Sequence, residues 1–116
     1  MLNKLLAKAE ELDWSYNICT EEYTGRSYVE LEKYSPEGED FIMTIEFDKG
    51  DEVDSFLEDL KEYADDFDVD EHVEMWIPSR GKGGCPSSIF DLLVDAKAIK
   101  DMIYELYDEL VEIKED

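Results

Sequence analysis

The sequence predicts a single α+β domain, in which helices pack on one face of a three-stranded antiparallel meander. Two observations predict this class. Apolar residues recur at helical spacing near both ends of the chain and over residues 53–67, whereas residues 14–47 alternate with a period of two. Turn-forming stretches separate the alternating runs, which gives the order α-β-β-β-α-(α)-α. Because 43% of its 116 residues are hydrophobic, the chain can bury one core, and residues 1–116 are expected to form one domain.

The N-terminal half predicts one short helix followed by three strands. Leu2, Leu5 and Leu6 fall on one side of a helix over roughly residues 2–12. Three alternating runs follow, WSYNICTEEY, YVELEKY and FIMTIEFD, separated by the turns TGRS and SPEGED. Gly25 of the first turn is free to adopt a positive φ. Side chains expected to share a face within their strand are Trp14, Tyr16 and Ile18, then Val29, Leu31 and Lys33, then Phe41, Met43, Ile45 and Phe47.

The C-terminal half predicts two long helices with a short one between them. Helical spacing returns over residues 53–67, and Asp51 is expected in the first turn, where a carboxylate interacts favourably with the helix dipole. VDEHVEMW adds one or two further turns, and a loop over residues 78–87 precedes the last helix. Ser88 and Asp91 have the spacing of a capping box. The buried face of the last helix is expected to be Ile89, Leu92, Leu93, Ala96, Ile99, Ile103, Leu106 and Leu110.

Net charge distinguishes this chain from an average domain. Thirty-three acidic residues stand against eleven basic ones, a formal net charge of −22. Such a charge opposes direct binding to nucleic acid or to an anionic membrane, and it favours a partner with a basic protein surface. No run is long and apolar enough for a signal peptide or a membrane span, and two cysteines are too few for a disulfide framework. We therefore expect a cytoplasmic protein.

The stretch DEHVEMWIPSRGKGGCPSS, residues 70–88, contains residue types of several known sites but matches none of them. A zinc deaminase needs two cysteines three residues apart, whereas Cys85 is followed at that spacing by a serine. A phosphate-binding loop needs Ser or Thr directly after its lysine, where this loop has glycine. We therefore expect His72 on a helix surface, and His72→Ala and Cys85→Ser to leave folding and function almost unchanged. Arg80 and Lys82 form a small basic cluster. Two alternatives exist for its acidic partner, which is either another part of this chain or another protein.

Neither a metal site nor an enzyme is predicted. DDFDVDE places Asp66, Asp68 and Asp70 like the first three ligands of an EF-hand. The glycine and the final glutamate that this calcium loop requires are replaced by Glu71 and Ile77. A Ser or Cys triad would need the single histidine beside its nucleophile, and paired carboxylates are uninformative among thirty-three acids. We expect no catalytic residues and no cofactor.

The acidic residues are densest over residues 46–74, where fourteen acids and two lysines give a net charge of −12. Acids near the C-terminal ends of two helices, among them Asp65, Asp66 and Asp68, oppose the helix dipole, and like charges four residues apart repel each other. Each acid at a helix end costs about 0.3–1 kcal/mol. Each pair of like charges costs about 0.2–0.5 kcal/mol. Because solubility alone does not require such placement, the negative surface is interpreted as functional. The predicted partner-binding face is Asp51, Glu52, Asp54, Glu58, Asp59, Glu62, Asp65, Asp66, Asp68, Asp70 and Glu71.

The spacing of these acids suggests imitation of DNA. Residues 51–66 carry eight acids over about 24 Å of helix, close to the spacing of phosphates along a DNA strand, about 3.4 Å. The leading hypothesis is a non-catalytic DNA mimic that blocks a basic nucleic-acid-binding protein, of the antirestriction or anti-CRISPR type. One alternative is an acidic interaction module, such as an antitoxin or assembly factor, that does not imitate DNA. Another is a structural domain whose acidity only keeps it soluble.

The block FDVDEHVEMWIPSRGKGGCPSSIFDLLVDAKAIKDMI, residues 67–103, resembles small acidic hypothetical proteins of Gram-positive bacteria and their mobile elements. It covers about a third of the chain and implies no activity. In composition the chain is also similar to DNA-mimic antirestriction and anti-CRISPR proteins, a likeness of charge that transfers no site residues. The sequence names neither a target nor an oligomeric state. Tyr104 and Tyr107 fit a dimer seam and the core equally well.

Overall fold

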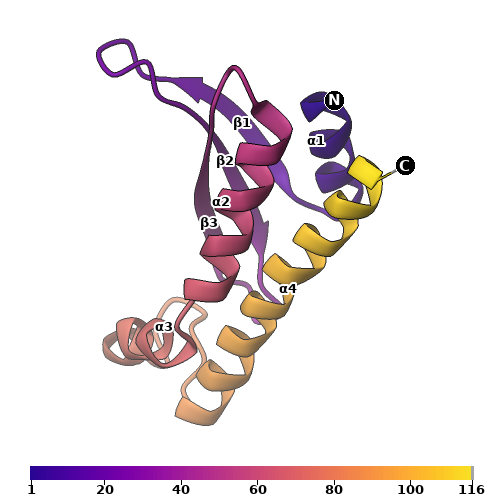
Figure 1. Cartoon of the computed structure of the whole chain (residues 1–116). Helices are drawn as coiled ribbons and strands as arrows, with labels where there is room; N and C mark the ends of the chain where they lie inside the picture. Colours follow the sequence, from indigo (N-terminus) through magenta and orange to yellow (C-terminus); the bar gives the residue numbers. More distant parts are fainter. Residues whose placement is uncertain (116) are drawn as a thin grey trace.

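Residues 1–115, which the computed structural model describes, form an α+β fold with three antiparallel strands and four α-helices (Figure 1). The elements are α1 (Leu2–Glu11), β1 (Ser15–Thr20), β2 (Ser27–Tyr34), β3 (Asp40–Phe47), α2 (Glu52–Asp66), α3 (Val69–Trp76), the 3-10 turn η1 (Ile77–Ser79) and α4 (Ile89–Glu115). The predicted fold class and element order are therefore confirmed.

The sheet is a meander in the order β1-β2-β3. Within the described chain no strand pairs with the outer side of β3, and we call that side the free edge of β3. Val29 of β2 lies opposite Ile45 of β3, and residues opposed in this way point to the same face. Gly25 has a φ of 69°, as predicted for the first turn. The apolar row of β3 is buried throughout, and consists of Phe41, Met43, Ile45 and Phe47.

The helices cover the apolar face of β2 and β3 but leave much of β1 uncovered. Trp14, which precedes β1, is only 2% exposed. Tyr16 and Ile18 lie opposite Leu31 and Val29 and share their face. They are nevertheless 37% and 45% exposed. The reason is that α2 packs beside β3 and α1 packs beside the start of β1, so the far end of the β1–β2 hairpin extends past the helical layer (Figure 1).

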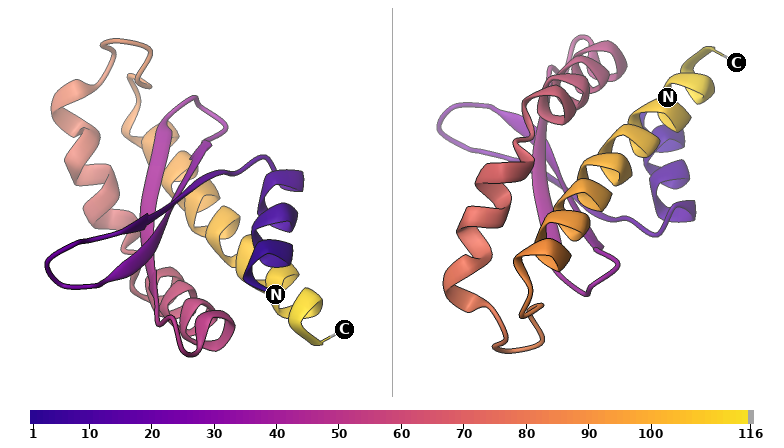
Figure 2. Two further views of the ribbon diagram at one scale, coloured as in Figure 1. Left: turned by 90° about the horizontal axis from the view of Figure 1, so that it is seen from above. Right: turned by 90° about the horizontal axis from the view of Figure 1, so that it is seen from below.

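α4 joins the other helices into one layer. It packs against α3 near its start, against α2 in its middle and against α1 near its end, so the last turns of α4 lie beside the first helix of the chain (Figure 2). Ile99 and Ile103 in its middle turns are fully buried. The prediction that Ile89 is buried is wrong, because its side chain is 47% exposed. At that end the apolar side chains of α4 pack in a small cluster around Val73 of α3, which does not cover Ile89.

The starts of α2 and α4 differ in part from their predicted form. Asp51 precedes α2 instead of lying in its first turn, and its side chain makes no capping hydrogen bond. The acids in that first turn are Glu52 and Asp54, which keep the favourable interaction with the dipole. Ser88 Oγ accepts a hydrogen bond from the N–H of Asp91 at 3.4 Å, which is one half of the predicted capping box.

A buried carboxylate fixes α4 to the turn between β2 and β3. Asp95 is 6% exposed. Its Oδ2 accepts a hydrogen bond from Ser35 Oγ at 2.7 Å, and its Oδ1 accepts one from the N–H of Glu37 at 3.1 Å. Ser35 Oγ in turn accepts from the N–H of Glu39 at 2.9 Å. This network holds the turn that precedes β3 in place.

Replacing Asp95 with alanine is expected to lower the free energy of unfolding by about 1–3 kcal/mol, because buried donors of the turn lose their acceptor. Urea unfolding followed by circular dichroism measures this change. Asp101→Ala, at an exposed position of the same helix, is the control and is expected to stay within about 0.5 kcal/mol of wild type. Equal unfolding curves for the two variants would contradict the role of Asp95.

Candidate functional site

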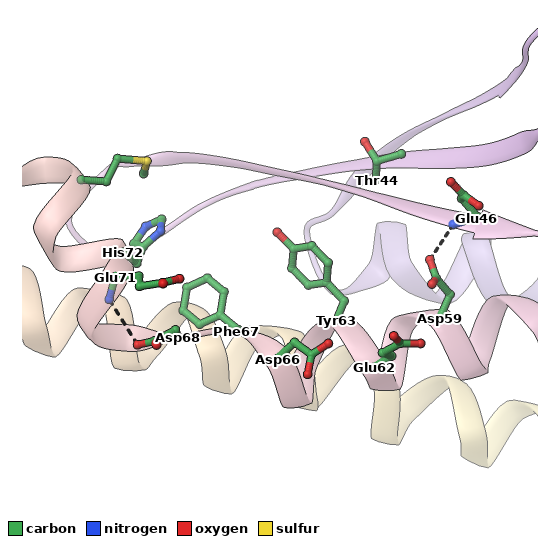
Figure 3. Close-up of a pocket in the computed structure, with 11 residues that line it drawn as sticks. Thr44, Glu46, Asp59, Glu62, Tyr63, Asp66, Phe67, Asp68, Glu71 and His72 are labelled. Carbon is green, nitrogen blue, oxygen red and sulfur yellow. Dashed lines mark hydrogen bonds between the residues drawn. The ribbon is translucent and has the colours of Figure 1, made fainter.

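A groove with a volume of about 730 Å³ runs along the free edge of β3, between that strand and the helices α2 and α3 (Figure 3). Six of the residues that line it are carboxylates, which makes it strongly negative. We call it the acidic groove, and its lining residues are Thr44, Glu46, Asp59, Glu62, Tyr63, Asp66, Phe67, Asp68, Glu71, His72 and Met75.

The helical wall of the groove follows from the register of α2. Phe56 and Leu60 of α2 are fully buried and fix which side of the helix faces the core. At 3.6 residues per turn, Asp59, Glu62 and Asp66 then follow one another along one flank of the helix. That flank faces β3, since all three residues line the groove.

The remaining wall depends on the break between α2 and α3. Phe67 ends α2 with an extended backbone, at φ −63° and ψ 114°. Asp68 then begins α3, because its Oδ1 accepts hydrogen bonds from the N–H groups of Asp70 at 3.0 Å and Glu71 at 3.2 Å. The acid at position 68 therefore stabilises the start of a helix, whereas the sequence suggested that it opposes the end of α2. The change of direction brings α3 against the end of the groove.

His72 forms a partly buried contact between α3 and the turn before β3. Its Nε2 lies 2.9 Å from both carboxylate oxygens of Glu39, and the two side chains are 12% and 14% exposed. The imidazole also packs against the rings of Phe41 and Phe67, with centroid distances of 6.1 and 5.2 Å. The prediction of a surface histidine is therefore wrong. Glu39 carried no signal in the sequence, because it lies thirty-three residues from its partner.

The eleven predicted binding residues do not form one face. Five of them line the acidic groove, namely Asp59, Glu62, Asp66, Asp68 and Glu71. Four others are exposed to solvent outside it, namely Asp51, Glu52, Glu58 and Asp70. Glu46, which the prediction omitted, completes the six carboxylates of the groove.

The last two predicted residues are neutralised on the opposite flank of α2. Asp54 forms an ion pair with Lys114 of α4. Both carboxylate oxygens of Asp65 lie 2.9 Å from Nζ of Lys61, and Asp65 also accepts a hydrogen bond from the hydroxyl of Tyr104. The row of acids predicted along α2 is thus divided among an uncompensated flank in the groove, two acids compensated on the flank against α4, and exposed acids that belong to neither.

Within the groove, the acids differ in their surroundings. Asp59 is partly buried and its Oδ2 accepts a hydrogen bond from the N–H of Glu46 at 2.8 Å. Burial raises the pKa of the Asp59 carboxyl above its ordinary value, because removal of water disfavours the charged form. Glu62, Asp66 and Glu71 form neither an ion pair nor a side-chain hydrogen bond with other side chains in residues 1–115. A cation entering the groove therefore meets acids that lack an internal partner.

The acidic surface continues from the groove onto the uncovered face of the sheet. Glu46 belongs to both, and it pairs there with Arg26. The register places Glu30 opposite Thr44 and Tyr28 opposite Glu46 on this face. The same face also carries Glu32, Tyr34, Asp40 and Ile42.

The glycine loop is held by backbone hydrogen bonds within itself. Gly81 has a φ of 71°, and its N–H donates to the carbonyl of Pro86 at 3.2 Å, which closes the loop on itself. Arg80 and Lys82 are exposed and form no ion pair with an acid in residues 1–115. No group of three His, Cys, Asp or Glu side chains in that part of the chain is arranged to hold a metal ion.

Comparisons of the chain with protein-family models, curated proteins and solved structures gave no match. Among the described residues, no helix is both long and apolar enough to cross a membrane. The chemistry of the acidic groove is therefore what separates the functional hypotheses.

Replacing His72 with alanine is expected to lower the free energy of unfolding by about 1–3 kcal/mol, because Glu39 is left partly buried without its partner. Thermal unfolding monitored by circular dichroism measures the change. Met75→Ala is the control on the same helix, since Met75 is 60% exposed. If His72→Ala is as stable as this control, the contact with Glu39 contributes nothing to the fold.

The Tyr104→Phe variant tests the contact of Asp65 with α4. The hydrogen bond from Tyr104 and then that from Lys61 lower the pKa of Asp65 below its ordinary value. A lowered pKa in the folded protein contributes stability that is present above the unfolded pKa and is lost as the pH falls through the folded value. Tyr104→Phe is therefore expected to raise the pKa of Asp65 and to weaken this acid-dependent loss of stability.

Carboxyl NMR titration of Asp65 in both proteins measures the shift. Tyr107→Phe is the matched control, because the Tyr107 ring also faces Lys61, at 6.0 Å, but makes no hydrogen bond to Asp65. An Asp65 titration that is the same in wild type and Tyr104→Phe would show that the hydroxyl has no influence on it.

Proposed function

We propose that this chain is a non-catalytic acidic binding protein whose acidic groove receives a Lys- and Arg-rich segment of another protein. The observation that carries this proposal is the grouping of six carboxylates in one concave site. His72 is the only basic side chain among the described residues that line it, and it is held by Glu39. Clefts lined by charge of one sign concentrate the field and attract groups of the opposite charge.

The uncharged side chains of the groove suit the same ligand. Exposed ion pairs contribute only about 0–1 kcal/mol each, so a stable complex needs further contacts. Tyr63, Phe67 and Met75 supply apolar surface beside the acids, and Met75 is 60% exposed. Lysine and arginine side chains have long apolar stems that can lie along such surface while their charged ends reach a carboxylate.

A DNA mimic is the second candidate. It requires acids on a protruding surface that enters a basic cleft, whereas the acids of α2 are divided and two of them are paired with lysines of the chain. The observation that favours mimicry is the uncovered face of the sheet, which carries Glu30, Glu32 and Asp40.

We further propose a cytoplasmic location, because Cys19 and Cys85, both described, form no disulfide.

A variant with Glu62→Gln, Asp66→Asn and Glu71→Gln is expected to bind a fluorescein-labelled Lys/Arg-rich peptide about tenfold more weakly than wild type. Fluorescence anisotropy measures the affinity, which is also expected to fall as salt is added. The matched control carries Asp101→Asn, Glu105→Gln and Asp108→Asn, which remove the same charge from exposed positions of α4. Equal weakening by both triple variants would contradict the groove and would assign binding to the net charge.

A further inference from the structure

The free edge of β3 has unpaired backbone groups at its centre. The N–H of Glu46 points away from β2, since it donates to Asp59 of α2 at 2.8 Å. In an antiparallel ladder every second residue points in the same direction, so Ile42 and Thr44 also direct their N–H and C=O groups to the free edge. Neither residue has a backbone partner on that side within residues 1–115.

These backbone groups lie beside the acidic groove. Thr44 lines the groove, and Figure 3 shows it on the strand above α2, with Tyr63 and Asp59 pointing from the helix toward the strand. The same hollow therefore offers a row of backbone donors and acceptors on one side and a row of carboxylates on the other. Unpaired strand edges are templates for the addition of a further strand.

We infer that the partner binds by strand addition, in which an extended basic segment pairs with β3 at Ile42 and Thr44 as a fourth strand. This inference rests on the proposed function and specifies the conformation of the segment that the groove receives. A second copy of this chain does not suit the site, because its own net charge of −22 would be brought against the acids of the groove.

The spacing of the acids specifies the sequence of such a segment. Side chains two residues apart in a strand point to the same face and are separated by about 6.5–7 Å. Glu62 and Asp66 are one helical turn apart on the flank of α2 that faces β3, about 5–6 Å. Lysine or arginine at every second position can therefore meet successive acids. The segment is short, because the Asp59 carboxylate already occupies the edge at Glu46.

The test uses wild-type protein and a peptide with lysine at every second position, titrated by isothermal calorimetry. Each backbone amide of the peptide is N-methylated in turn, which removes one donor and blocks close approach of a strand. Methylation is expected to lower the affinity by about tenfold or more at alternate residues and to have little effect between them, since only alternate N–H groups face β3.

A pair of protein variants tests the same contact from the other side. Thr44→Pro removes the outward N–H of β3, and proline is tolerated in edge strands. Thr44→Val keeps the backbone donor and is the matched control. Thr44→Pro is expected to weaken peptide binding at least about fivefold relative to Thr44→Val. Circular dichroism checks its folding, and if Thr44→Pro does not fold, the methylated peptides on wild-type protein decide the question.

The outcomes separate this inference from the proposed function. Binding that depends on Glu62, Asp66 and Glu71 but shows no alternation with N-methylation would overturn strand addition and leave the proposed function standing. No binding of the unmodified peptide would overturn both. Alternating loss of affinity together with the effect of Thr44→Pro supports strand addition.

Discussion

The burial of one face of β3 determines where the acidic groove lies. Because successive side chains of a strand point to opposite faces, burying Phe41, Met43 and Ile45 turns Thr44 and Glu46 outward. α2 must direct its own apolar stripe into the same core and therefore lies beside β3 without covering the edge of the strand. What remains between them is a hollow with one wall of backbone and one wall of polar helix flank.

The few cations that contact helix α2 lie away from this hollow. Lys114 and Lys61 pair with acids on the flank of α2 that faces α4, and Lys100 Nζ donates to the carbonyl of Phe67 at 2.7 Å, where α2 ends. The two ion pairs are exposed and individually weak, but they reduce repulsion, and the Lys100 cation offsets the dipole at the end of α2. In the groove, by contrast, the described residues supply only the imidazole of His72, and Glu39 holds it. Negative charge is thus compensated at the helix packing, and at Glu46 by Arg26, whereas the charges of Glu62, Asp66 and Glu71 in the groove have no cationic partner within residues 1–115.

Periodicity in the sequence was enough to predict the strands, the helices and the apolar row of β3, because those features depend on neighbours two to four residues away. The groove could not be predicted in this way. It depends on the contact of His72 with Glu39 and on the rotation of α2 about its axis, both set by tertiary packing. The same limit explains Ile18, whose pattern is that of a buried strand residue but which no helix covers. It also explains why two acids adjacent in the sequence differ, since Asp65 pairs with Lys61 whereas Asp66 lines the groove.

A mobile basic segment cannot be held by charge alone. Ordering its backbone costs roughly 1–2 kcal/mol per residue, which matches or exceeds the 0–1 kcal/mol expected from each exposed ion pair. The deficit must be met by contacts of another kind, and the groove offers two, the unpaired backbone of Ile42 and Thr44 and the rings of Tyr63 and Phe67. The net charge of the protein accelerates encounter with any cationic partner, whereas the strand edge accepts only a chain that can extend along it. Under the proposed strand addition, the backbone of β3 therefore selects for an extended chain, and the carboxylates select for a basic one.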